Sequence, residues 1–185
     1  MRSVGAAASA ANASSRELTV LSRRDPVFMP GHLRWLYKTF AYVPAATDRN
    51  ALGIEGYLKQ YPSPADLRTF MMNYCDDATA ATFTVVKVYE GKYDPRNPSA
   101  EANVDIQYAQ AIAYPTPRTF YSIGARVRWS GRSKEPARAD PFLEWLNYML
   151  AEPKIPQTIS TSYGYPDSEK GFPLEYMIAI CNLFA

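Results

Sequence analysis

Short segments rich in β-branched residues alternate with segments of helical pattern along this 185-residue chain, and this alternation constrains the fold more than any other feature. The pattern predicts strands at 51–58, 82–88, 113–121 and 157–162. It predicts helices at 32–40, 64–74, 100–111, 141–150 and 174–184. Strands that alternate with helices form mostly parallel sheets with helices on both faces. The expected fold class is therefore α/β.

Two kinds of residue sharpen the expected strands. The segment 82–88 is rich in β-branched residues and reads as a buried strand. Pro115 and Pro117 lack the backbone N–H that a central strand uses, so 113–121 is expected to be an edge or irregular strand.

Two helix starts also carry clear signals. Pro64 suits the first turn of a helix, and the nearby Asp66 suits the positive end of the helix dipole. Asp140 is the expected cap of the helix at 141–150. These signals fix where the second and fourth helices should begin.

Composition and charge argue against several classes of protein. The formal net charge is +2, which gives no strong attraction to nucleic acid or to a membrane surface. The longest apolar runs are too short to cross a bilayer. Cys75 and Cys181 are too few for a disulfide framework, and the sequence leaves open whether they pair or remain thiols.

The first residues differ in composition from the rest of the chain. Residues 1–15 are rich in alanine and serine and lack the apolar segment of a secretory signal. We expect 1–25 to be a disordered lead-in and 26–185 to form one folded unit.

Basic residues gather in 118–138, where Tyr121 and Trp129 lie among them. The basic side chains are Arg118, Arg126, Arg128, Arg132, Lys134 and Arg138. Basic residues with aromatic neighbours can bind nucleic acid, but a solvated loop is the preferred interpretation. The chain has one histidine, His32, at the start of a predicted helix. A surface or capping role suits it better than a place in a catalytic triad.

The segment 101–107 (Glu-Ala-Asn-Val-Asp-Ile-Gln) places two carboxylates four residues apart. In a helix, Glu101 and Asp105 would lie on one face, near the positive end of the dipole. Such spacing also occurs on ordinary solvated helices. A pair that faces a cleft could share a proton, as general acid–base chemistry requires.

Several blocks, in order and at consistent spacing, resemble the sedolisin family of serine-carboxyl peptidases, which includes fungal tripeptidyl peptidases. The blocks are residues 33–37 (Leu-Arg-Trp-Leu-Tyr), 42–44 (Tyr-Val-Pro), 52–58 (Leu-Gly-Ile-Glu-Gly-Tyr-Leu), 61–63 (Tyr-Pro-Ser), 66–70 (Asp-Leu-Arg-Thr-Phe), 101–108 (Glu-Ala-Asn-Val-Asp-Ile-Gln-Tyr), 142–146 (Phe-Leu-Glu-Trp-Leu), 156–164 (Pro-Gln-Thr-Ile-Ser-Thr-Ser-Tyr-Gly) and 181–185 (Cys-Asn-Leu-Phe-Ala). The resemblance implies an incomplete subtilisin-like sheet and identifies 26–185 as the amino-terminal half of a peptidase catalytic domain.

The resemblance also implies roles for individual residues. Glu101 would be the general base of a serine nucleophile at acid pH, and Asp105 would orient it and share its proton. The strand near the substrate cleft would contribute Ser160, Ser162, Tyr163 and Gly164 to peptide binding. Ser160 and Ser162 are not expected to be the nucleophile, which the family carries in a later Gly-Thr-Ser motif.

Other parts of the family pattern are expected outside this chain. The sequence contains neither a Gly-Thr-Ser segment nor the Ser-Gly-Asp segment that carries the family's oxyanion aspartate. The family's calcium site is expected beyond Ala185, and no cofactor is expected in this chain. The chain alone is expected to be inactive, and the incomplete sheet is expected to promote self-association. The partner is expected to be a peptide, outside the cell. The alternative is a non-catalytic relative that binds peptides or a partner protein.

Overall fold

The structure is a computed structural model that describes residues 28–124, 141–164 and 174–184. All strand pairs in the described part are parallel. The strands are β1 (Leu52–Gly56), β2 (Thr84–Tyr89), β3 (Arg118–Gly124) and β4 (Thr158–Ser160). The helices are α2 (Pro30–Leu36), α3 (Pro64–Tyr74), α4 (Ala100–Ala113), α5 (Pro141–Ala151) and α6 (Leu174–Phe184), with a short 3-10 turn, η1 (Asp76–Ala78). The α/β fold class is confirmed.

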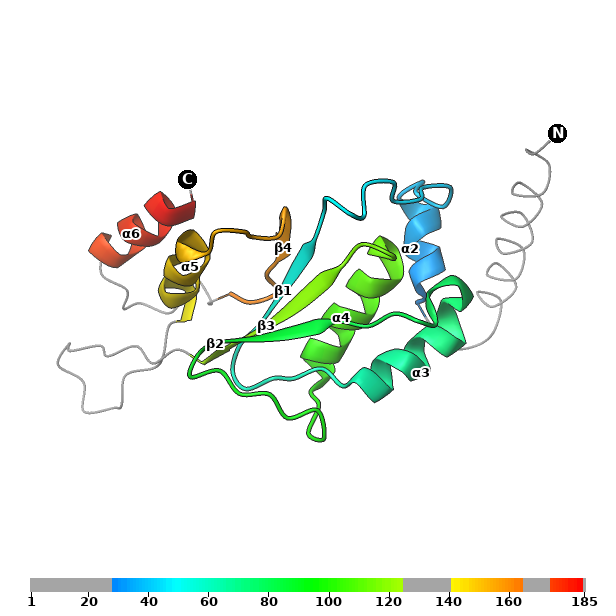
Figure 1. The fold of residues 1–185 in the computed structure, drawn as a ribbon, viewed down its shortest axis with the longest axis horizontal. Coiled ribbons are helices and arrows are strands. Elements are labelled where there is room, and N and C mark those ends of the chain that lie inside the picture. The colour runs from blue at the N-terminus through cyan, green and yellow to red at the C-terminus, as the bar shows by residue number, and fades with distance from the viewer. Residues whose placement is uncertain (1–27, 125–140, 165–173, 185) are drawn as a thin grey trace.

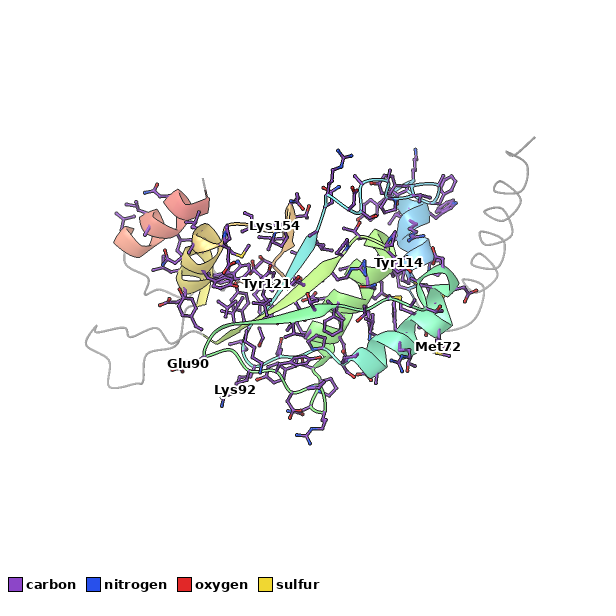
Figure 2. All side chains as sticks on the ribbon, viewed as in Figure 1. Met72, Glu90, Lys92, Tyr114, Tyr121 and Lys154 are labelled. Atoms are coloured by element: carbon purple, nitrogen blue, oxygen red, sulfur yellow. The ribbon has the colours of Figure 1, made fainter. Side chains whose placement is uncertain are left out.

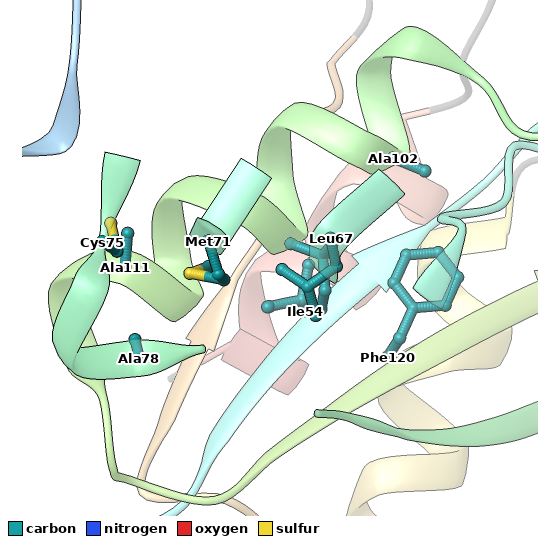
Figure 3. Packing of buried hydrophobic residues seen from close by; sticks show 9 residues of the cluster. Ile54, Leu67, Met71, Cys75, Ala78, Ala102, Ala111 and Phe120 are labelled. Carbon is teal, nitrogen blue, oxygen red and sulfur yellow. The ribbon is translucent and has the colours of Figure 1, made fainter. Parts of the chain in front are cut away.

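Helices cover both faces of the four-stranded sheet, whose strand order is β2-β3-β1-β4 (Figure 1). On one face, α3 and α4 pack against Ile54 and Phe120 in a cluster of fully buried side chains that includes Leu67, Met71 and Ile106 (Figure 3). On the other face, α5 packs against a second cluster. Its members are Tyr57, Val88, Tyr121, Ile123, Trp145, Leu146 and Met149. The sheet is thus a middle layer between two apolar cores, as expected for an α/β fold.

The third strand is central, and the expectation of an edge strand at 113–121 is wrong. β3 pairs with β1 on one side and with β2 on the other. The strand begins at Arg118, so Pro115 and Pro117 precede it and remove no hydrogen bond from the ladder. The prolines mark the turn that leads into the strand.

The expectation of a buried strand at 82–88 is also wrong. β2 is an edge strand that pairs with β3 alone among the described strands. Only Val88 in it is fully buried. Its β-branched side chains suit the pleated surface of an edge strand as well as that of a central one, so composition could not decide between them.

Local signals located the helices well. α3 has the predicted bounds, and the Ser63 side chain accepts a hydrogen bond from the Asp66 backbone N–H at its start. α6 also has its predicted bounds, and α5 extends one residue beyond its expected end. The first helix is shorter than predicted and ends at Leu36.

His32 is buried and caps the start of α2, so a capping role is confirmed and a surface role is not. Its Nδ1 accepts a hydrogen bond from the backbone N–H of Met29, 3.1 Å away, at the start of α2. Of the basic segment, Arg118 is buried rather than solvated, and burial lowers its pKa to about 10. The other basic residues of 118–138, the expected Asp140 cap and the lead-in 1–25 lie outside the described residues. Cys75 is buried, Cys181 is exposed, and no disulfide joins them.

Gly56 tests how closely β1 and β3 are packed. A methyl group added at Gly56 would overlap the ring of Phe120, whose Cε2 would lie 2.8 Å away. Phe120 is fully buried and cannot move aside freely. We expect Gly56→Ala to lower the free energy of unfolding by about 1–3 kcal/mol, measured by urea denaturation.

Gly164 provides the matched control, because an added methyl group there would meet nothing within 4 Å. We expect Gly164→Ala to change the free energy of unfolding little. Equal effects of the two substitutions would contradict the described packing.

Candidate functional site

The carboxyl edge of the sheet is where the candidate residues meet. Parallel strands all end at the same edge, and the helix between two such strands begins there. From β1 the chain continues into α3 on one face of the sheet, whereas α6, which follows β4, packs with α5 on the other face. In open α/β sheets, ligands bind beyond the carboxyl ends of neighbouring strands whose connections leave in opposite directions. β1 and β4 form such a pair.

The start of α4 places the acid pair at this edge. Ser99 caps the helix, because its side chain accepts a hydrogen bond from the backbone N–H of Ala102. Ala102 and Ile106 are fully buried beneath the helix. Glu101 and Asp105 lie one turn apart away from that apolar stripe, and both are half-buried.

Asp105 contacts the segment that follows β4. The Ser162 hydroxyl donates a hydrogen bond to Oδ1 of Asp105, 3.0 Å away. Burial raises the pKa of Asp105 above its ordinary value, the Ser162 hydrogen bond lowers it, and the charge of Glu101 raises it. The structure therefore brings together Glu101, Asp105 and Ser162, which are up to 61 positions apart in the sequence.

Tyr163 lies in the same group. Its hydroxyl donates a hydrogen bond to Oε1 of Gln60, 2.7 Å away, and its ring packs edge-on against Tyr57 at 4.9 Å between centroids. Burial raises the pKa of Tyr163 to about 12, and the negative charges of Asp105 and Glu101 also favour its protonated form. Tyr163 is therefore a neutral hydrogen-bond donor beside the acid pair.

A third carboxyl group, Glu55 of β1, was not among the predicted site residues. Its side chain is buried, and it accepts hydrogen bonds from the Tyr57 hydroxyl and from the Thr161 and Trp145 side chains. Burial raises the pKa of Glu55, and these hydrogen bonds lower it in part. The available signal was a carboxylate within an apolar strand, because a buried charge is costly unless it is partnered or neutralised.

The aromatic side chains behind Glu55 come from β3 and α5. The Trp145 ring packs against Tyr121, with 4.8 Å between centroids. Tyr121 projects from β3 toward α5 (Figure 2). This apolar backing keeps water from one side of the Glu55 carboxyl group.

The remaining candidate residues, Ser160 and Gly164, are placed but have fewer contacts. Ser160 is the exposed last residue of β4, in register with Ile54. The strand ends there, two residues earlier than predicted, so Ser162 and Gly164 lie in the segment beyond it. This segment is exposed except at Tyr163.

The group can bind and transfer protons, since it combines interacting carboxyl groups with hydroxyl donors at a partly dry edge. In the described ranges, no cluster of three or more histidine, cysteine or carboxylate side chains could hold a metal ion. None of the helices in those ranges is both long and apolar enough to span a bilayer.

The two raised carboxyl pKa values predict that acid stabilises the fold. A carboxyl group whose pKa is higher in the folded state than in the unfolded state stabilises the fold when protonated. That contribution is complete below the ordinary pKa and is lost as pH rises through the folded-state pKa. We expect Glu55→Gln to flatten the fall of the free energy of unfolding over this pH range, measured by urea denaturation at several pH values.

The exposed Asn147→Gln substitution changes no ionisable group; it is the control and should leave the slope with pH unchanged. Parallel pH profiles for the parent chain and Glu55→Gln would show that Glu55 has an ordinary pKa in the folded state.

Comparison with known proteins identifies the relatives of the chain. It is 34% identical over 161 residues to "Probable tripeptidyl-peptidase SED2" of Arthroderma benhamiae and to "Tripeptidyl-peptidase SED2" of Arthroderma otae. It is 34% identical over 165 residues to "Probable tripeptidyl-peptidase SED3" of Trichophyton verrucosum. These alignments cover 83–84% of the chain and 27% of each relative, so the chain spans about a quarter of their length.

No family model matches the chain, and no solved structure matches it. These relatives nevertheless all carry tripeptidyl-peptidase names, and their alignments extend over most of the chain. Over the matched part of its length, the chain belongs to the sedolisin family of peptidases.

Proposed function

We propose that this chain carries the proton-transfer part of a serine-carboxyl peptidase that works at acid pH. The observation that carries the proposal is the position of Asp105, half-buried beside Glu101 and hydrogen-bonded to Ser162 at the carboxyl edge. The tripeptidyl-peptidase relatives support peptide cleavage as the activity and peptides as the substrate class.

In this proposal, Glu101 is the general base. A serine hydroxyl is a weak nucleophile until a base takes its proton. Glu101 would accept that proton while the serine oxygen attacks the peptide carbonyl carbon, and it would later return the proton to the leaving amine. Asp105 would hold Glu101 in place and share the proton, since two close carboxyl groups titrate as a coupled pair. Its raised pKa suits a proton-sharing partner.

The nucleophile is not assigned to this chain. The sequence lacks the Gly-Thr-Ser and Ser-Gly-Asp segments that the family uses for the serine and the oxyanion aspartate. The Ser162 hydroxyl donates its hydrogen bond to Asp105 rather than to Glu101, the proposed base. We likewise assign no calcium ligand to the described residues, and we propose that any calcium ion of the working enzyme is held elsewhere.

The exposed segment after β4 is the proposed contact for the peptide. Ser160 and Gly164 are exposed on either side of Ser162, which contacts Asp105, and an extended peptide could form backbone hydrogen bonds along this segment. An acidic extracellular setting would suit this chemistry, because a carboxylate base works best near its own pKa.

A cleavage assay tests the assignment of the catalytic groups. We expect the 185-residue chain to release no product from a fluorogenic tripeptide at about pH 4, because it lacks the nucleophile. If the chain does cleave the peptide and Glu101→Gln abolishes that cleavage, the chain has a nucleophile after all, and the role of Glu101 stands. Turnover that persists in Glu101→Gln would contradict both assignments.

Peptide binding separates the proposed site from an unrelated function. In an NMR titration of the chain, a peptide with a free amino end should shift the amide signals of residues 160–164 and of Asp105. An oligonucleotide of similar length should leave these signals unchanged. If the peptide shifts no signal at this edge at millimolar concentration, the site does not bind peptides.

The alternative is a non-catalytic relative that binds peptides through the exposed segment after β4. The reading frame downstream of codon 185 in the transcript distinguishes the two. Codons for Ser-Gly-Asp and Gly-Thr-Ser would favour the peptidase, and an in-frame stop would favour the alternative.

We also propose that the chain self-associates through the edge of its sheet. All three residues of β4 are exposed, and among the described strands β4 pairs with β1 alone. An open edge presents unpaired backbone groups to a second chain. We expect sedimentation velocity to show concentration-dependent association, and Thr158→Lys on β4 to reduce it. Leu174→Lys, at an exposed apolar position on α6, is the control, and an equal effect there would contradict pairing through β4.

A further inference from the structure

Asn103 lies between the two members of the acid pair on α4, yet it faces the other way. With about 100° of rotation per residue, its side chain points roughly 160° away from those of Glu101 and Asp105. The acid pair faces the segment after β4, whereas Asn103 faces the start of α3. Any contact that fixes Asn103 therefore also fixes the direction in which the acid pair points.

Both ends of the Asn103 side-chain amide are held. Its Oδ1 accepts a hydrogen bond from the backbone N–H of Ser63, 2.9 Å away. Its Nδ2 donates a hydrogen bond to Oδ2 of Asp66, 2.7 Å away. One partner is a donor and the other is a charged acceptor, so only one orientation of the amide satisfies both.

The partners of Asn103 are themselves fixed. Ser63 is buried, and its side chain caps α3 by accepting a hydrogen bond from the Asp66 backbone N–H. Just ahead of α4, the backbone N–H of Ser99 donates to the carbonyl of Tyr61, 2.9 Å away. The first turn of α4 is thus attached at two points to residues 61–66, which follow β1.

We propose that Asn103 is a positioning residue that sets the rotation of α4, so that Glu101 and Asp105 face the carboxyl edge and Asp105 reaches Ser162. The inference rests on the proposed function, because positioning matters only if the pair transfers a proton. Small misplacements are costly in such sites: a displacement of about 1 Å can reduce the rate roughly 100-fold.

The residue type at this position is specific to the contacts. A leucine would have similar size but would leave the buried Ser63 N–H without its acceptor and Asp66 without its donor. An aspartate would keep the acceptor for Ser63 but would place two carboxylates face to face. Of these three residues, only asparagine provides one donor and one acceptor at the required points.

Carbon-13 carboxyl NMR of the 185-residue chain tests the proposal without any substrate. The groups facing Asp105 are Glu101 on its own helix and Ser162 and Tyr163 across the edge. Burial is the largest cause of the raised pKa of Asp105. We expect Asn103→Leu to let α4 rotate, to expose Asp105 and to lower its titration midpoint toward the ordinary value. An unchanged midpoint would overturn the proposal.

Met71→Ala is the control for general loss of stability. Met71 of α3 is fully buried in the apolar cluster that α3 and α4 share. It lies away from the first turn of α4 (Figure 3). We expect it to lower the melting temperature while leaving the Asp105 midpoint in place. If it shifts the midpoint as much as Asn103→Leu does, Asn103 has a structural role alone.

An exchange of side chains provides a second test in case Asn103→Leu does not fold. Asn103→Asp alone should shift the amide signals of Asp105 and Ser162. The added Asp66→Asn substitution restores one donor and one acceptor between the two positions and should return those signals toward the parent chain. Failure of this rescue would overturn the proposal. Since neither measurement involves peptide cleavage, failure of the positioning role and failure of the peptidase proposal are distinguishable.

Discussion

Partial removal of carboxyl groups from water at one edge of the sheet is the interaction on which the site depends. Glu55 is buried against Trp145, and Asp105 is half-buried against the segment after β4. In both, burial opposes the charged form more strongly than the neighbouring hydrogen bonds support it. The fold therefore keeps protons on these groups to higher pH than water would. The same burial makes acid favourable to the fold itself.

The sequence predicted the order of the elements better than their environment. Proline at the start of α3 and the apolar spacing of α6 gave both helices their bounds, because these are local signals. The position of a strand within the sheet, by contrast, depends on the path of the whole chain and not on local signals. β3 became central because the chain crosses from β2 to the position beside β1, whereas its flanking prolines suggested an edge. β2 has the composition of a core strand, yet its place in the sheet leaves it exposed.

The site was predictable where one short segment carried it. The spacing of Glu101 and Asp105 on a helix was sufficient to place them on one face, and the family resemblance gave that face a role. Glu55 and Asn103 gave weaker signals. Glu55 is notable only once β1 is known to be buried, and Asn103 only once α3 is seen against α4. Residues that work through long-range contacts cannot be distinguished from solvated polar residues in a single sequence.

The geometry of the acid pair is held by contacts within the described part of the chain. Tyr61, Ser63 and Asp66 hold the first turn of α4, and Ser162 meets Asp105 from the far side. None of these contacts requires a nucleophile or a substrate. Charge-stabilising groups act best when they are oriented before the reaction, since no energy is then spent on turning them during it. In the proposed mechanism, a serine hydroxyl brought to this edge would therefore meet an acid pair whose direction the fold had already set.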